Sequence, residues 1–289
     1  MHQVDNDFEC VDIYKQPSLQ HPLLKNHKIQ LYPTFAKNIM RNGPSNGKTM
    51  NGCPEGKVPI YNKIRRHQII TNSSLKLQID DFQQYSQSAP GYHVHPSLYG
   101  DSQVRLIGQW TADGYKKTGC FDNRCSGFVQ VDHNITLGSL VSPLNSIGST
   151  EKVSSYIKIK QDRSTGHWWL IVQLESIYVG YWPKELFTHL STGASLIRFG
   201  GQTYASPNKD SPPMGSGRLP KEKFRNSAFM RNLEIIDSDY NEVDVNDRYM
   251  KPYTDTNSEC YDLAYNGYQG PRYKQAFLYG GPGGPNCGI

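Results

Sequence analysis

The residues of this 289-residue chain that could do chemistry are a pair of histidines and a few scattered acids. His93 and His95 stand two apart in GYHVHP, so on a strand they would share a face and could grip a metal ion. The sequence offers no third ligand, and a structural or surface role is favoured for both. Asp113, Glu175 and Glu185 have no partner at a spacing that would pair two carboxyls, so structural roles are favoured for them too.

Six cysteines favour an oxidising compartment, because no CxxC pair or neighbouring histidine indicates zinc. Fifteen pairings are open. Two sequons, at Asn72 and Asn134, are typical of a glycosylated secreted protein. The first residues, MHQVDNDFECVD, lack the basic and apolar regions of a signal peptide, so we expect a start further upstream or a lost signal. The sequence-local pairing joins Cys10 to Cys53, Cys120 to Cys125 and Cys260 to Cys287.

The charge pattern argues against nucleic-acid and membrane partners. The net charge is only +5, and the nearest approach to a basic cluster is KIRRH at 63–67, which a solvated loop or a processing site explains. No stretch approaches the roughly 18 apolar residues that span a bilayer. A monomer without a cofactor is a separate expectation.

Secondary-structure elements must position the residues that could do chemistry. The residue composition, which indicates these elements, changes along the chain. Residues 1–66 are dense in turn residues and predict a small appended module or pro-segment, tied by Cys10–Cys53 if that pairing is right. Residues 67–90 are polar and predict a linker with one short strand, LKLQI. The domain proper is expected over 67–289.

From residue 91 onward the strand signals become regular. VRLIGQW and SYIKIKQ alternate with a two-residue period, whereas HWWLIVQL is apolar on both faces and predicts a central strand. PKELFTHLSTGA, with Pro183 at its start and Gly193 at its end, is the one helix candidate. Many short strands with Gly and Pro turns predict an all-β fold, an antiparallel β-sandwich with a short helix.

Large aromatic rings gather in two neighbouring stretches, GHWWL and YVGYW. Such rings dominate the cores of β-sandwiches, so we interpret these residues mainly as parts of the core and of a cleft wall. Rings at a cleft edge would also serve as a platform for proline rings or sugars. The group comprises Trp168, Trp169, Tyr178, Tyr181 and Trp182.

Several long motifs occur in one order: HPSLYGD, WTADGYKKTGCFDNRCSGFVQ, GHWWL, VGYWPKELF, FGGQ, PMGSGRLP and LYGGPGGPNC. Together they resemble the plant neprosin family. The N-terminal CVDIYKQPSLQHPLLKNHKIQ and CPEGKVPI resemble that family's activation peptide. The resemblance covers nearly the whole chain.

The resemblance implies a secreted glutamic peptidase that cuts after proline and needs no metal. It also implies a β-sandwich catalytic domain and an N-terminal pro-domain that plugs the cleft until acid triggers its removal. A pair of glutamates in the cleft would do the chemistry. One carboxylate takes a proton from the attacking water, while the other group holds or donates a proton as the tetrahedral intermediate forms.

The chain departs from this pattern at both glutamate positions. The first, two residues before the glycine of the motif that leads into LYGD, is matched by Ala89. The second, directly after the double glycine, is matched by Gln202. Alanine cannot bind a proton, and an amide donates and accepts hydrogen bonds but is not a base. Taken without the family, Gln202 would be a polar strand residue on a face shared with Arg198.

Only residues 67–90 fill the gap in which the family has a longer segment with its first strands. We therefore expect the domain to lack those strands. Because Ala89 and Gln202 replace both glutamates, we also expect the peptidase to be impaired, with binding of peptides or cell-wall polymers retained. The expected binding residues are Trp168, Trp169, Tyr181, Trp182 and Gln202. Two alternatives stay open: an active prolyl endopeptidase with displaced carboxylates, and an incomplete gene model.

Overall fold

A computed structural model describes the greater part of the chain. For residues 72–80 and 87–90 it describes the backbone alone. The described ranges are 8–36, 52–61, 72–80, 87–150, 152, 154–173, 177–205 and 208–287. Within them, no helix is long and apolar enough to cross a membrane.

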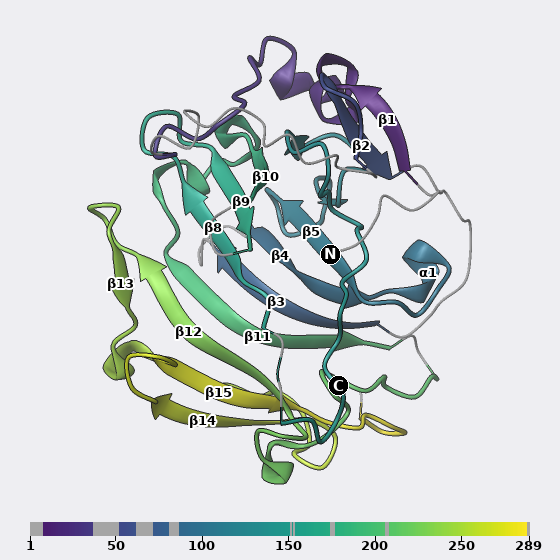
Figure 1. Ribbon diagram of the computed structural model, residues 1–289, viewed down its shortest axis with the longest axis vertical. Helices are drawn as coiled ribbons and strands as arrows, with labels where there is room; N and C mark the ends of the chain where they lie inside the picture. Colours follow the sequence, from purple (N-terminus) through teal and green to yellow (C-terminus); the bar gives the residue numbers. More distant parts are fainter. Residues whose placement is uncertain are drawn as a thin grey trace.

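Three antiparallel sheets form the body of the described molecule (Figure 1). The aromatic sheet has the order β7 (Val129–Gln130), β10 (Ile177–Trp182), β9 (Trp168–Val172), β8 (Ile157–Gln161). The five-stranded sheet has the order β11 (Leu196–Tyr204), β3 (Asn72–Asp80), β4 (Gln87–Val94), β5 (Arg105–Thr111), β6 (Cys120–Phe121). The C-terminal sheet has the order β13 (Glu242–Asp244), β12 (Ala228–Ile236), β15 (Gln275–Gly280), β14 (Asp262–Tyr268). The predicted all-β antiparallel fold is confirmed.

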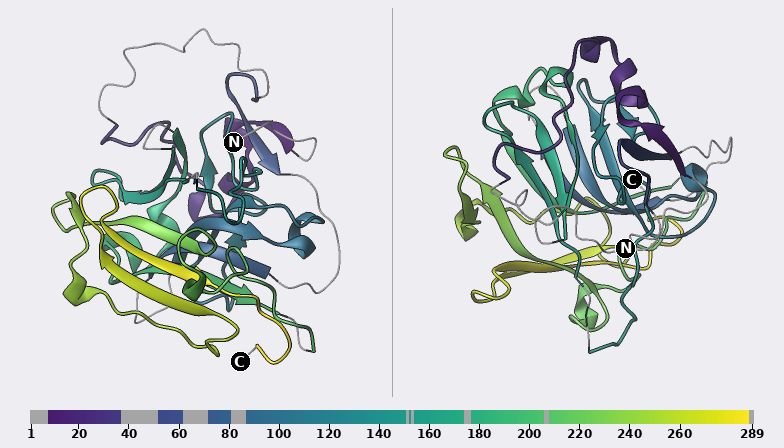
Figure 2. Two further views of the ribbon diagram at one scale, coloured as in Figure 1. Left: turned by 60° about the horizontal axis from the view of Figure 1, so that its bottom comes forward. Right: turned by 45° about the horizontal axis from the view of Figure 1, so that its top comes forward.

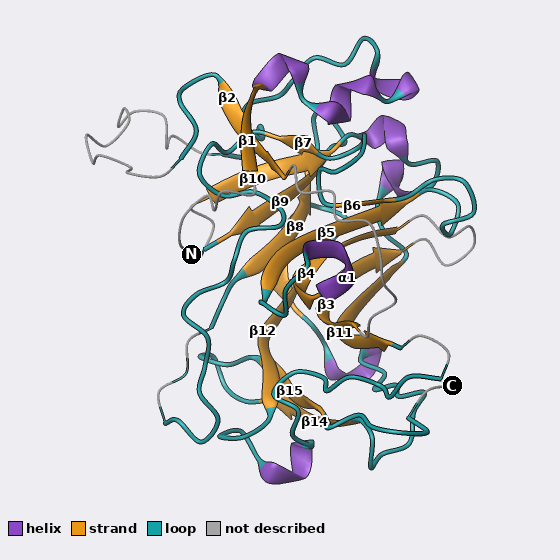
Figure 3. Cartoon of the chain, turned by 90° about the vertical axis from the view of Figure 1, so that its right-hand side faces the viewer, coloured by secondary structure: helices purple, strands orange, loops and turns teal. Residues whose placement is uncertain are grey.

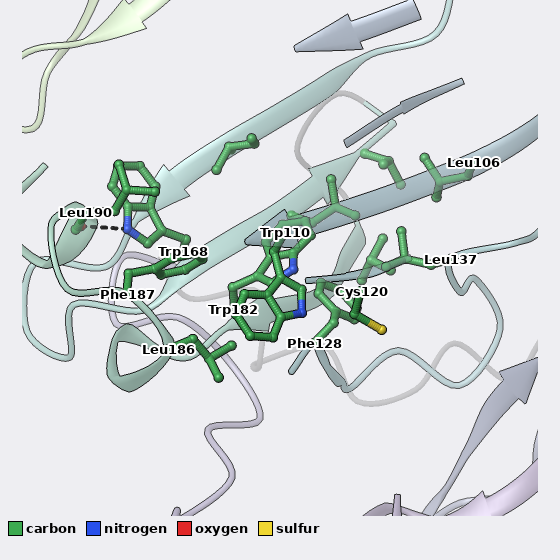
Figure 4. Close-up of a cluster of buried hydrophobic side chains, with 14 of the residues drawn as sticks. Leu106, Trp110, Cys120, Phe128, Leu137, Trp168, Trp182, Leu186, Phe187 and Leu190 are labelled. Atoms are coloured by element: carbon green, nitrogen blue, oxygen red, sulfur yellow. Dashed lines mark hydrogen bonds between the residues drawn. The ribbon is translucent and has the colours of Figure 1, made fainter. Parts of the chain in front are cut away.

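The inner core lies where the aromatic sheet packs on the five-stranded sheet. β9 is apolar on both sides, and its residues alternate between two clusters: Trp168 and Leu170 face the inner core, whereas Trp169 and Ile171 face the opposite side. The prediction of a central strand here is correct. In the inner core Trp182 packs edge-on against Phe128, with ring centroids 4.7 Å apart (Figure 4).

The described N-terminal residues form a compact segment on the far side of the molecule from the C-terminal sheet (Figure 2). Its strands β1 (Phe8–Asp12) and β2 (Lys57–Tyr61) pair with each other, and between them run the short 3₁₀ turns η1 (Ile13–Lys15), η2 (Pro17–Gln20) and η3 (Pro22–Leu24). Ile29 and Phe35 pack on the outer side of the aromatic sheet, against the cluster of Val129, Trp169, Ile171 and Tyr181. Leu24 reaches the inner core itself.

All three sequence-local disulfides are present. The bonds join Cys10 to Cys53, Cys120 to Cys125 and Cys260 to Cys287.

The helix predicted in PKELFTHLSTGA is wrong. The stretch forms two separate 3₁₀ turns, η5 (Lys184–Leu186) and η6 (Leu190–Thr192), with Phe187 extended between them. Side chains of the aromatic sheet take its carbonyls: Trp168 Nε1 donates to Leu190 O at 2.9 Å. The apolar residues are still buried in the inner core, so tertiary packing overrides a helix too short to be stable alone.

The single α-helix of the described chain, α1 (Pro96–Tyr99), lies elsewhere, in HPSLYGD (Figure 3). The His95 side chain caps it by accepting from Leu98 N at 3.2 Å. Gly100, at a φ of 81°, ends it in the left-handed conformation.

Residues 67–90 supply more structure than a linker with one short strand. β3 extends over Asn72–Asp80 between β11 and β4, and β4 begins at Gln87. The polar composition hides a two-residue period, because Leu75, Leu77 and Ile79 alternate with polar residues. Whether the domain lacks strands that its relatives have stays a prediction.

Candidate functional site

Gln202 lies on β11, the edge strand of the five-stranded sheet, and is exposed. Strand pairing sets Gln202 opposite Ser74, Ser74 opposite His93, and His93 opposite Arg105. Residues directly opposed in antiparallel strands project to the same side of the sheet. Leu106, which alternates with Arg105, belongs to the inner core, so this row lies on the side turned away from that core. We refer to it as the Gln202 face.

Position 89 lies on the Gln202 face as well, four residues from His93 on β4. Ala89 pairs with Gln109, and the registers of β3 with β4 and with β11 align it with Arg198. From a strand spacing of about 4.8 Å and a rise of about 3.3 Å per residue, its Cα lies about 16 Å from that of Gln202. The backbone therefore keeps the two family positions on one face, at a distance that leaves room for a peptide between them.

The residue types on the Gln202 face are mostly amides, hydroxyls and cations. Among the four strands β3, β4, β5 and β11, Asp80 is the one carboxyl on this face, in a row that ends at Leu196, six residues from Gln202. Alternation assigns to the face Asn72, Ser74, Lys76, Gln78, Asp80, Gln87, Ala89, Gly91, His93, Arg105, Ile107, Gln109, Thr111, Leu196, Arg198, Gly200, Gln202 and Tyr204.

A glycine directly before Gln202 fixes how β11 packs. A Cβ at Gly201 would lie 2.4 Å from Met214 Sδ and 3.0 Å from the Tyr279 ring, so the strand touches the core of the C-terminal sheet there. A Cβ at Gly200 would meet nothing within 4 Å. The FGGQ motif thus presses one side of β11 against the C-terminal sheet and presents Gln202 on the other.

A buried polar cluster that the sequence analysis missed begins on this face, at Arg105. Arg105 is fully buried, donates to Asp101 Oδ2 at 2.7 Å, and lies 4.9 Å from the Tyr99 ring centroid. Asp122 accepts from Tyr99 Oη at 2.5 Å and from Gly108 N at 3.1 Å. Burial raises the pKa of Asp122 to about 6, against the opposing effect of these hydrogen bonds. In the sequence, the acids and arginines of this cluster stand in three separate motifs, LYGD, VRL and FDNRC. No periodicity connects these motifs, so the sequence does not show that their side chains meet.

The two histidines of GYHVHP do not act as a free pair. Their ring centroids lie 4.8 Å apart. The His95 Nδ1 that caps α1 also contacts Ser97 Oγ, at 3.0 Å. Burial, with the nearby Arg124 charge, lowers the pKa of His95 to about 4. His95 is therefore a neutral capping residue.

Of the three acids considered from the sequence, the two that the structure describes, Asp113 and Glu185, lie in different elements. Asp113 accepts from Lys116 N, Lys117 N and Thr118 N in a turn, and the hydrogen bonds, led by that of the Thr118 hydroxyl, lower its pKa to about 2. Glu185 lies on η5 facing two histidines. Glu175 lies outside the described residues.

The aromatic residues expected to bind are all buried. Trp168 and Trp182 belong to the inner core, whereas Trp169 and Tyr181 lie under the N-terminal segment. The prediction that these rings are core residues therefore agrees with their position. That they bind a ligand stays a prediction.

Tyr181 connects the N-terminal segment to the aromatic sheet. Its hydroxyl lies 2.8 Å from His27 Nε2 and accepts from Gln30 N at 3.0 Å. The His167 ring stacks on Tyr181, with centroids 4.9 Å apart and planes 16° from parallel. Burial lowers the pKa of His27, opposed by Glu185, and lowers that of His167 to about 4. Both imidazoles are therefore neutral near pH 7.

Asp162, at the turn between β8 and β9, makes the second polar connection. Its carboxylate accepts from Thr34 N at 2.6 Å, from Thr34 Oγ1 at 2.6 Å and from Gln30 Nε2 at 2.8 Å. Burial alone would raise the pKa of Asp162, but these bonds and one from Ser164 N outweigh it and lower the pKa. The segment is thus held by charge-assisted hydrogen bonds as well as by apolar packing.

Two overlapping ranges of the chain match known protein families. Residues 67–282, about three quarters of the chain, match the Neprosin family, and residues 5–99 match the neprosin activation peptide. The first match holds the five-stranded sheet and the Gln202 face, and the second holds the segment bound to Tyr181 and Asp162. The chain is a member of the neprosin family.

Proposed function

We propose that this protein is a neprosin whose peptidase chemistry is impaired and which binds proline-containing peptides or cell-wall polymers. The observation that carries the proposal is the composition of the Gln202 face, whose four strands hold no carboxyl near Gln202. Hydrolysis by general acid and base needs a group that takes a proton from water. An amide at Gln202 and a methyl at Ala89 supply none.

The Gln202 face supports binding in place of hydrolysis. Amide and hydroxyl side chains donate and accept hydrogen bonds to peptide groups and sugar hydroxyls alike. Gln202 is exposed on an edge strand, next to Arg198 and Tyr204, which are exposed on the same face. An extended polymer lying along β11 would contact this row of side chains.

Family membership and the three disulfides support a secreted plant protein. Glycosylation is proposed at both sequons, Asn72 at the start of β3 and Asn134 in the loop after β7. Asn134 is half-buried, with its side chain against Gly52 of the N-terminal segment.

The decisive experiment restores the carboxyl pair. The unmodified chain and the double variant Ala89→Glu, Gln202→Glu are assayed at acid pH for cleavage of a proline-containing peptide. The matched control is Gln202→Glu alone, which adds one carboxyl to the same face at an exposed position and leaves the pair incomplete. We expect cleavage by the double variant alone. Robust cleavage by the unmodified chain would disprove the proposal that its peptidase chemistry is impaired.

A second candidate function is an active prolyl endopeptidase with a displaced carboxylate. Asp80 favours it, because it lies on the Gln202 face. If the unmodified chain does cleave, Asp80→Asn tests this assignment, and activity that survives the change assigns the chemistry to another acid. An incomplete gene model is tested separately, by searching transcripts for coding sequence between residues 66 and 91 or upstream of Met1.

A further inference from the structure

Three side chains from distant parts of the chain meet where the N-terminal segment touches the domain. His27 follows η3 in the segment, His167 precedes β9, and Glu185 lies on η5. Glu185 Oε2 lies 3.9 Å from His27 Nδ1 and 4.0 Å from His167 Nδ1. One ligand atom from each of the three lies within 4.8 Å of those of the other two.

The surroundings hold the two rings in place. The Tyr181 hydroxyl contacts His27 Nε2, so this nitrogen donates to the hydroxyl when Nδ1 carries the free lone pair. A histidine that binds a metal through one nitrogen usually gives its other N–H to such a partner. His167 stacks on the Tyr181 ring, and its Nδ1 accepts a long hydrogen bond of 3.2 Å from Lys184 N.

We propose that His27, His167 and Glu185 bind a divalent transition-metal ion of the Zn²⁺ class and that this ion latches the activation-peptide segment onto the domain. Two imidazoles and one carboxylate, with water as the fourth ligand, form a familiar zinc set. At metal–ligand distances of about 2.0–2.1 Å, tetrahedral ligands lie about 3.4 Å apart. The observed separations therefore need a contraction of about 0.5–1.4 Å.

The Glu185 carboxylate can close its own two separations, of 3.9 and 4.0 Å, whereas the two histidine nitrogens, at most 4.8 Å apart, must approach by a small rotation of the rings. Glu185 is 37% exposed on a short turn, whereas the His27 and His167 side chains are 4% and 7% exposed. The exposed side also gives the ion an entry path and room for its water. Binding through His167 Nδ1 replaces the hydrogen bond from Lys184 N, so the metal–nitrogen bond must outweigh the loss of that contact.

The ion would act as a latch because its ligands come from both sides of the contact. His27 belongs to the segment, and His167 and Glu185 belong to the domain, so the complete set exists only while the segment is docked. A ligand that binds only the docked state suppresses opening by the factor 1 + [L]/Kd, about 100-fold at 100 times Kd. This effect does not depend on whether the domain cleaves peptides.

The test uses the full chain, with Zn²⁺ followed by calorimetry and Co²⁺ followed by its visible absorption. The variants are His27→Ala and Glu185→Gln, and the matched control is His133→Ala, whose histidine is exposed. Glu185→Gln alters an exposed side chain, so it keeps the test valid if His27→Ala fails to fold. We expect one Zn²⁺ per chain, a tetrahedral Co²⁺ spectrum, and affinity lower by at least about tenfold in both variants.

Hydrogen exchange over residues 24–36 supplies the second measurement. Exchange should slow as Zn²⁺ saturates the unmodified chain and the His133→Ala control, and in Glu185→Gln it should respond only at Zn²⁺ concentrations at least about tenfold higher. No binding, or binding that both variants retain, overturns the site. Binding without slower exchange overturns the latch.

Discussion

Replacing Asp162 by alanine tests how the N-terminal segment is held. The carboxylate accepts three hydrogen bonds from the segment, two from Thr34 and one from Gln30. We expect Asp162→Ala to loosen the segment while the sheets stay folded, because the inner core does not contain Asp162.

The magnitude follows from the number and kind of bonds. A hydrogen bond to a charged group contributes about 1.5–3 kcal/mol, so three would give an upper bound of about 4.5–9 kcal/mol. Asp162 is itself fully buried, but Thr34 is exposed and Gln30 is half-buried, so water replaces much of what these donors lose. We therefore expect the free energy of segment opening to fall by about 2–4 kcal/mol, or about 30- to 900-fold in the opening equilibrium.

The assay is native-state hydrogen exchange, followed in peptides that cover residues 24–36 and, for comparison, β9. The matched control is Asp239→Ala, which removes an exposed acid in the turn between β12 and β13. Exchange in 24–36 should accelerate by the stated factor, with β9 unchanged. Acceleration below about threefold, or equal acceleration in β9, would refute the view that Asp162 holds the segment locally.

Two further predictions concern acidity and packing. His27 and His167 bind protons more weakly when the N-terminal segment is docked on the domain. Docking should therefore be unaffected above about pH 6.5 and should weaken as the pH falls toward 4. Hydrogen-exchange protection factors over residues 24–36 that stay constant from pH 7 to 4 would contradict this. Gly201→Ala should cost about 1–3 kcal/mol of unfolding free energy, because its Cβ meets Met214, whereas Gly200→Ala should cost far less. Urea midpoints measure the difference, and equal midpoints for the two variants would disprove the packing argument.

How far the sequence predicts the fold depends on how local the signal is. HWWLIVQL reads correctly as a central strand, because each of its two faces is apolar by itself. The sequence underestimates the length of β3, because its polar residues outnumber the apolar ones, although Leu75, Leu77 and Ile79 keep the two-residue period. PKELFTHLSTGA looks helical in isolation and is not, because a tryptophan from another strand takes a carbonyl that a helix would use.

For the candidate site, too, the sequence predicts what depends on local signals and misses what depends on distant contacts. Motifs on both sides of Gln202 place it in the sequence, but its row with His93 and Arg105 depends on strand register, which short-range patterns do not give. His27 and Glu185 meet across more than a hundred residues of chain, and neither stands in a motif of metal ligands. Contacts of this kind arise from tertiary packing, so they become visible only once the segment is seated on the sheet.

The arrangement of the disulfides has a consequence for processing. Each of the three bonds closes a loop within its own region, and Cys10–Cys53 joins the N-terminal segment to itself. No disulfide of the chain crosses from residues 1–61 to the rest, because all six cysteines are used in these bonds. A backbone cut between residues 61 and 72 would thus yield two pieces that part without reduction. Their separation would then be a reversible binding equilibrium, with an affinity that competing peptides, dilution and solvent conditions can shift.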